Sequence, residues 1–271
     1  MTAKDLKNAL LQEAVQGRLV PQIASEGNAR DLLEEIKKSH TDLQISTKSA
    51  DKKSRDLRSK SQIRVTKKEL PPITQEEIPF DIPDSWCWCR LGELFLKITD
   101  GTHKTPKYLP SGVPFLSVKD MSSGKLDFSN TKFISEEEHK ELYKRCNPER
   151  GDLLITKVGT TGIPVIVDTD KIFDLFVSVA LCKPVGNIIY MKFMVAFINS
   201  PFVQGQIARD TIGSANKNWV IDKIANTVIP LPPLAEQKRI VHALEIILPT
   251  IEEYQKKEEE LAKLLLSRRI S

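Results

Sequence analysis

The sequence predicts an α+β fold, in which one mixed α/β domain is flanked by an N-terminal helix and a long C-terminal helix of coiled-coil type. Two β-rich runs, residues 152–157 and 163–167, surround a turn bounded by glycines, which is typical of a hairpin. From Ile240 onward, apolar residues recur at spacings of four and three, which indicates a heptad helix. Residues 1–22 carry an apolar stripe at helical spacing.

The N-terminal helix is expected to run from Met1 to about Gln22, with Gly17 and Pro21 marking its end. Residues 28–38 predict a short second helix that Asn28 can cap. The first 40 residues are therefore assigned to a helical segment.

Residues 41–77 are assigned to a basic linker. Between Lys37 and Lys68 there are eleven Lys or Arg against three Asp, an excess larger than the net charge of +4 for the whole chain. This composition favours a solvated loop over the alternative of a basic strap near nucleic-acid phosphates. Because the rest of the chain is slightly acidic, binding to nucleic acid would need local basic clusters.

The mixed domain is expected to begin near Ile78. Trp86 and Trp88 alternate with Cys87 and Cys89, so the indoles share one face of a strand and are expected in the core. The four cysteines of the chain contain no CxxC pair, which disfavours zinc and favours reduced, packed thiols.

A polar loop at residues 98–108 follows and supplies a first group of candidate contacts to DNA. Gly101 permits a close approach of the backbone, and the loop carries short polar side chains and lysines. His103 has no second histidine or carboxylate at metal-ligand spacing, so it is interpreted as a loop residue. The candidates here and after the next strand are Gly101, Thr102, His103, Lys104, Lys107 and Lys119.

The turn of the predicted hairpin resembles a phosphate loop only superficially, since it lacks the Lys-Ser/Thr ending and leads into a strand. Its candidate contacts are Lys157, Thr160 and Thr161. Residues 211–219 supply the last candidates, Ser214, Asn216, Lys217 and Asn218, because Asn pairs well with adenine and Lys with guanine or phosphate. The alternative for this segment is an ordinary Gly- and Asn-containing turn. Helices are also expected at 135–145, 188–198 and 201–208.

The C-terminal helix follows a stiff turn made by Pro230, Pro232 and Pro233. Pro249 should bend it, and Glu258 interrupts its apolar seam. Such a seam predicts a partner helix or a docking surface, although a helix that simply closes the domain has the same pattern. The seam consists of Ile240, Leu244, Ile247, Ile251, Tyr254, Leu261 and Leu265.

Several function classes lose support from the sequence. No apolar run approaches the roughly 20 residues of a membrane span, and the polar N-terminus lacks the apolar region of a signal peptide, so a cytoplasmic protein is expected. No adenine-methylation motif, Walker phosphate loop, HxxxH pair or compact nuclease-like carboxylate set is found.

Three phrases resemble type I restriction–modification specificity (S) subunits. They are LPPLAEQKRIV at 231–241, LKNALLQEAVQGRLVPQ at 6–22 and IPFDIPDSWCWCRLGEL at 78–94. The resemblance implies a target recognition domain with a curved β-sheet at 78–233, a spacer helix at 234–271, and an N-terminal helix that packs on this spacer. Full S subunits hold two recognition domains and two spacer helices, so this chain resembles a half-subunit.

By this resemblance the chain is a non-catalytic DNA reader without a cofactor or metal of its own. The partners implied are double-stranded DNA, methyltransferase (M) subunits that use S-adenosylmethionine, and a restriction (R) subunit that uses ATP and Mg. The helix length predicts that two copies pair antiparallel and read a two-part, palindromic site. The alternatives are a stand-alone nuclease or modification enzyme with an unrecognised site, and a helical scaffold that binds no DNA.

Overall fold

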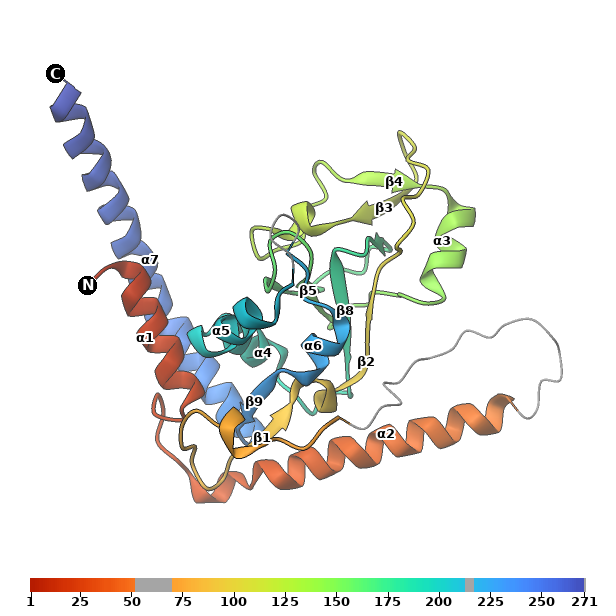
Figure 1. The fold of residues 1–271 in the computed structure, drawn as a ribbon, viewed down its shortest axis with the longest axis horizontal. Helices are drawn as coiled ribbons and strands as arrows, with labels where there is room; N and C mark the ends of the chain where they lie inside the picture. The colour runs from red at the N-terminus through yellow and green to blue at the C-terminus, as the bar shows by residue number, and fades with distance from the viewer. Residues whose placement is uncertain (52–69, 213–216, 271) are drawn as a thin grey trace.

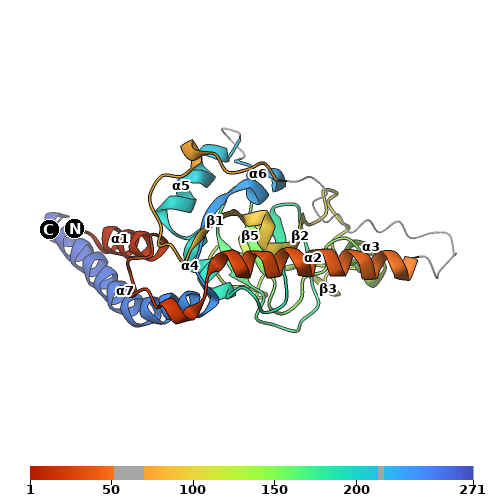
Figure 2. The same cartoon turned by 90° about the horizontal axis from the view of Figure 1, so that it is seen from below.

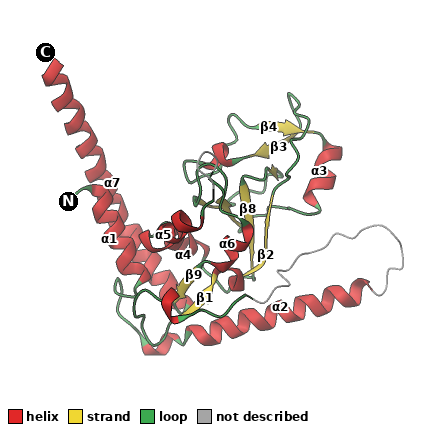
Figure 3. Ribbon diagram, viewed as in Figure 1, coloured by secondary structure: helices red, strands yellow, loops and turns green. Residues whose placement is uncertain are grey.

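The computed structural model describes residues 1–51, 70–212 and 217–270, and confirms the predicted α+β architecture (Figure 1, Figure 3). The helices of this part are α1 (Ala3–Val15), α2 (Ala29–Asp51), α3 (Glu136–Tyr143), α4 (Met191–Ile198), α5 (Pro201–Asp210), α6 (Ile221–Asn226) and α7 (Leu234–Ile270). The strands are β1 (Cys87–Arg90), β2 (Phe95–Asp100), β3 (Val113–Leu116), β4 (Lys132–Ile134), β5 (Leu153–Thr156), β6 (Pro164–Ile166), β7 (Asp174–Leu175), β8 (Val179–Pro184) and β9 (Val228–Leu231).

A four-stranded antiparallel sheet in the order β2-β8-β5-β6 forms the centre of the domain. Its β5–β6 pair is the hairpin predicted from residues 152–167, with Leu154 opposite Val165. Alternate residues of β5 enter different cores: Leu153 and Ile155 enter one, and Leu154 enters the other. Because successive side chains of a strand point to opposite faces, this sheet is buried on both sides.

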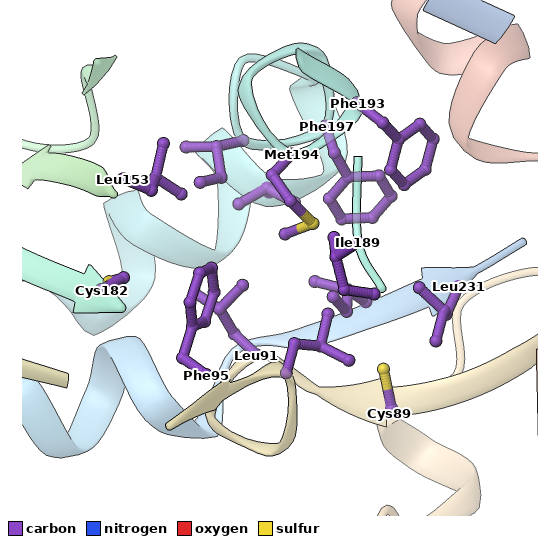
Figure 4. Close-up of a cluster of buried hydrophobic side chains, with 14 of the residues drawn as sticks. Cys89, Leu91, Phe95, Leu153, Cys182, Ile189, Phe193, Met194, Phe197 and Leu231 are labelled. Atoms are coloured by element: carbon purple, nitrogen blue, oxygen red, sulfur yellow. The ribbon is translucent and has the colours of Figure 1, made fainter. Parts of the chain in front are cut away.

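The larger core lies between this sheet, helices α4 and α5, and the β1–β9 pair. Figure 4 shows Leu153 and Cys182 of the sheet and Phe193, Met194 and Phe197 of α4 in this cluster. All four cysteines are buried and free, as expected.

Two further sheets complete the domain. β1 pairs antiparallel with β9, so Cys89 lies opposite Ile229 and the two ends of the domain are joined. In the sheet β4-β3-β7, β3 pairs antiparallel with β4 and parallel with β7. No described helix is both long and apolar enough to cross a membrane.

The two N-terminal helices differ in length from the expectation. α1 ends at Val15, because Gly17 takes a left-handed conformation (φ 72°) and lies against Pro83, where an added Cβ would collide. α2 continues to Asp51 instead of ending near Lys38. No Gly or Pro lies between Ala29 and Asp51, so nothing in this stretch breaks the helical hydrogen-bond series. The beginning of the expected linker is therefore helical.

α1 lies antiparallel along α7, and the two helices point away from the sheets together (Figure 1, Figure 2). At the N-terminal end of α1, the Ala3 amide donates to Glu258 Oε2 at 2.9 Å. A carboxylate at this position satisfies an unpaired helix amide and complements the helix dipole. Glu258, which interrupts the apolar seam, therefore fixes the register of α1 on α7.

α3 is attached to the β4-β3-β7 sheet by a buried polar contact. His139 Nδ1 lies 2.6 Å from Asp174 Oδ2, while Asp174 Oδ1 is buried without a hydrogen-bond partner. Burial raises the pKa of the Asp174 carboxyl to about 6, although the contact with His139 opposes the shift.

We expect Asp174 to make the fold less stable as pH rises from 4 to 6. In that window the folded state holds a proton that the unfolded state has released, so the free energy of unfolding falls by about 2–3 kcal/mol at most. Asp174→Asn should remove this fall, as measured by urea unfolding at each pH. Asp170→Asn is the matched control, because Arg150 lowers the pKa of the exposed Asp170 and its effect has the opposite sign. An unchanged pH profile in Asp174→Asn would contradict the assignment.

Candidate nucleic-acid interface

The loop after β2 is fixed to the segment that connects β7 with β8. Thr102 N donates to Leu175 O and Val177 N donates to Thr102 O, both at 3.0 Å. A Cβ on Gly101 would collide with Leu175 O. The close backbone approach expected at Gly101 is therefore an approach to the protein's own chain, and it leaves the following residues at the surface.

Ser178, which directly precedes β8, binds two further loops. Its Oγ accepts from Val118 N at 3.1 Å, in the 3-10 turn Val118–Met121 that carries Lys119. Its carbonyl accepts from Lys157 N at 2.8 Å, at the beginning of the β5–β6 loop. Three loops from distant parts of the sequence thus meet at residues 175–178.

The fourth predicted segment lies against the β5–β6 loop. Gly159 N donates to Lys217 O at 2.9 Å, and Trp219 N donates to Lys157 O at 2.8 Å. We refer to residues 101–108, 118–121, 157–163, 211–212 and 217–219 as the loop cluster. Ser214 and Asn216, also predicted as contacts, lie outside the described residues.

The loop cluster presents several of the predicted side chains to solvent. The exposed ones are His103, Lys104, Lys107, Lys119, Thr160 and Lys217, while Thr102, Thr161 and Asn218 are partly buried. The ion pairs within the described part of the cluster involve His103 and Lys157, so Lys104, Lys107 and Lys217 have no carboxylate at ion-pair distance there. Exposed lysines of this kind suit contact with phosphates.

Lys157 is the clear exception to the expectation. Its residue is only 3% exposed, and its ammonium lies 3.3 Å from Asp100 Oδ2 and donates to Val177 O at 3.2 Å. It follows directly on β5, where its side chain enters the domain, so the ammonium does not face solvent. The interpretation of Lys157 as a surface contact is corrected to that of an interior ion-pair member.

Two other candidates, His103 and Asn218, have partners within the protein that the sequence did not predict. The His103 ring nitrogen Nε2 lies 3.3 Å from the carboxylate of Asp100, three residues earlier, so His103 has a carboxylate neighbour that its position in a polar loop did not predict. Among the described residues, no three His, Cys, Asp or Glu side chains could together hold a metal ion. Asn218 pairs with Ile212 through the backbone, and its Oδ1 is buried without a partner.

A second constellation lies at the base of α7, and sequence reasoning did not identify it as a site. Glu236 is 1% exposed; its Oε2 accepts from Trp86 Nε1 at 2.9 Å and its Oε1 from Gln22 Nε2 at 2.6 Å. Burial raises the pKa of Glu236, and these two hydrogen bonds partly offset the shift. We call this group of three residues the helix joint. It brings together one residue from each of the three phrases that carry the family resemblance.

The neighbouring residues of α7 strengthen the helix joint. Arg239 forms a bidentate pair with Glu26 at 2.7 and 2.8 Å. Gln237 accepts from Tyr190 N at 3.0 Å and donates to Pro232 O at 3.0 Å. The direction in which α7 leaves the domain is therefore fixed by side chains of the motif itself.

The apolar seam of α7 divides into a covered and an open part. Ile240 and Leu244 are buried in the larger core, so they close the domain. Ile251 is partly buried, whereas the remaining seam residues Ile247, Tyr254, Leu261 and Leu265 are 37–58% exposed. The covered part closes the domain, which is the simpler of the two expectations. The open part is exposed in this structure, and its pairing stays a prediction.

A family model, that of the type I restriction modification DNA specificity domain, matches residues 83–263. The type I restriction enzyme EcoAI specificity subunit of Escherichia coli is 26% identical over 254 residues, which cover 90% of this chain and 40% of that protein. This chain thus spans well under half the length of that relative.

Solved structures share the fold. A chain from a type I R-M system structure matches with a TM-score of 0.53 at 17% identity, covering 92% of this chain and 57% of that chain. The HsdS subunit from Thermoanaerobacter tengcongensis matches with a TM-score of 0.50 at 18% identity, covering 87% of this chain and 55% of that chain.

Trp86→Phe should destabilise the chain by about 1–3 kcal/mol, because it removes a donor from a buried carboxylate. Trp88→Phe is the matched control, since Trp88 is only partly buried and packs against Phe80 and Phe202. It should cost less in urea unfolding. A double-mutant cycle with Glu236→Met, which removes both acceptor oxygens, should show coupling for Trp86 and none for Trp88. Equal losses and no coupling would contradict the role of the helix joint.

Proposed function

Because this chain belongs to the type I restriction modification DNA specificity domain family, we propose that it is the DNA-reading subunit of a type I restriction–modification complex. In this proposal it recognises one half of a bipartite target and has no catalytic activity of its own. The observation that carries the proposal is the family match, since residues 83–263 include both the mixed domain and most of α7.

We propose that residues 1–40 form a helical segment, 41–77 a basic linker whose beginning is the last part of α2, 78–233 the recognition domain, and 234–271 the spacer helix. The loop cluster is the proposed DNA-reading face of the recognition domain. Its exposed lysines suit phosphates, and Thr102, Thr160 and Thr161 supply short polar groups for base edges. Phosphate contacts position such a domain, whereas base contacts give it specificity.

The proposed partners are double-stranded DNA, M subunits and an R subunit, in the cytoplasm where the DNA lies. In such a complex, S-adenosylmethionine, ATP and Mg belong to the partner subunits. Methylation and cleavage then occur where this chain places those subunits. The cellular test is methylome sequencing of cells that make this chain together with its M subunit, in which a new bipartite methylated sequence supports the proposal. An unchanged methylome would count against it.

We further propose that two copies pair through α7. The 37 residues of α7 correspond to about 55 Å at 1.5 Å per residue, and one turn of DNA is roughly 34–36 Å. The helix is therefore long enough for an antiparallel pair to separate two recognition domains by about one turn of DNA. Antiparallel pairing of identical helices is a two-fold operation, so the two half-sites would be inverted repeats. The open part of the seam would supply the apolar surface for pairing. Because the helix joint holds each α7 on its own domain, the length of the helix pair would set the distance between the two domains.

Lys104→Ala and Lys217→Ala should each weaken binding to a random-sequence duplex and flatten its dependence on salt concentration. Each lost phosphate contact lowers the slope of log K against log salt by about 0.9. The matched control is Lys238→Ala, which removes the same charge from an exposed position at the base of α7. Fluorescence anisotropy over a range of salt concentrations measures both quantities. Slopes equal to that of the wild type in both loop variants would exclude the loop cluster as the phosphate-binding face.

Light scattering at micromolar concentration should give the mass of a dimer for the wild-type chain and that of a monomer for the double variant Ile247→Asp with Ile251→Asp. Two charges in the apolar seam would be costly to bury at the interface. Ile246→Asp is the matched control, because Ile246 is 62% exposed but lies off the seam. A wild-type monomer that directs methylation of an asymmetric site would refute pairing.

A further inference from the structure

We propose that Asp100 and Lys157 form a positioning pair, which holds two loops of the loop cluster in the arrangement that reads DNA. This inference rests on the proposed function and deepens it. Asp100 is the last residue of β2 and Lys157 directly follows β5, so each residue stands at the root of one loop. Their side chains meet inside the domain at 3.3 Å, and both residues are buried.

Lys157 forms hydrogen bonds that connect several segments of the loop cluster. Its ammonium donates to Val177 O at 3.2 Å, and Val177 N donates to Thr102 O. Its backbone carbonyl accepts from Trp219 N at 2.8 Å. One residue therefore joins the β5–β6 loop to the loop after β2 and to the segment that carries Lys217.

Asp100 is correspondingly surrounded. Arg145 Nη2 donates to Asp100 Oδ1 at 2.9 Å and to the Asp100 carbonyl at 2.6 Å, while the Arg145 side chain remains half exposed. His103 Nε2 lies 3.3 Å from the same carboxylate. Asp100 thus orients Lys157 below the surface and Arg145 and His103 at its edge.

The energetics favour a role in geometry over a role in stability. A buried ion pair contributes little net stability, because the cost of removing both charges from water offsets their attraction. Removing Lys157 alone leaves the buried Asp100 carboxylate with the half-exposed Arg145 as its remaining guanidinium partner and should be destabilising, whereas removing both buried charges is often close to neutral. Asp100→Asn keeps an amide oxygen that can accept from Arg145. Loss of the pair as a whole should therefore leave a folded domain whose loops are less well held.

Salt dependence separates this role from direct contact with DNA. A lysine that binds a phosphate releases a counterion from the DNA, and a lysine buried in the protein does not. Replacement of Lys157 should therefore lower the preference for the cognate sequence without flattening the salt slope. Lys104→Ala and Lys217→Ala should flatten it.

The experiment uses the full chain and a pool of random duplexes, from which the wild type selects its preferred sequence. Lys157→Met, and Lys157→Met combined with Asp100→Asn, are then compared with the wild type for unfolding, salt slope, and the affinity ratio of the preferred to a random duplex. The single variant should be destabilised. The double variant should recover most of that stability, keep the wild-type salt slope, and still show a ratio at least about tenfold lower, which corresponds to the loss of one good base contact.

Three outcomes would overturn the inference. Recovery of the affinity ratio together with stability in the double variant would show a merely structural pair. A slope lowered by about 0.9 in a Lys157 variant would show a direct phosphate contact. A wild-type chain that selects no sequence would overturn the proposed function and this inference with it, whereas the first two outcomes leave the proposed function intact.

Discussion

The buried carboxylate of Glu236 is the interaction on which the rest of the structure depends. A carboxylate with 1% exposure is stable only when its oxygens are hydrogen-bonded, and here Trp86 of the mixed domain and Gln22 of the N-terminal segment provide the donors. These two donors are far from Glu236 in the sequence. Satisfying one buried group therefore fixes three segments relative to each other, and α7 leaves the domain in a defined direction.

Burial of the central sheet places a comparable constraint on the polar residues of the domain. β5 and most of β8 are buried on both faces. Polar residues next to these strands in the sequence can therefore reach solvent only in the loops at the strand ends. The loops at those ends hydrogen-bond to residues 175–178, at the end of β7 and in the segment between β7 and β8. A set of short polar loops on such a scaffold can vary in sequence while its framework stays constant.

The helix joint and the loop cluster have different roles in the proposed function: the first positions the domain, and the second contacts DNA. In the proposed function, the helix joint and α7 would determine where the recognition domain lies, and the loop cluster would determine which DNA groups it contacts. The hydrogen bond from the Ala3 amide to Glu258 fixes the register of α1 along α7, because that amide can donate to only one carboxylate. Affinity would come mainly from exposed lysines, whereas sequence preference would depend on how firmly the loops are held.

The sequence by itself determined the heptad helix, the β5–β6 hairpin, the helices α3, α4 and α5, and the family, because spacing, turn residues and motif words are local. It also indicated most of the exposed polar loop residues. It could not show that Lys157 is buried, that α2 continues to Asp51, or that Glu236 accepts from Trp86 and Gln22. A side chain's burial and partners depend on residues far away in the chain, so only the tertiary structure decided which charges face solvent and which hold the fold together.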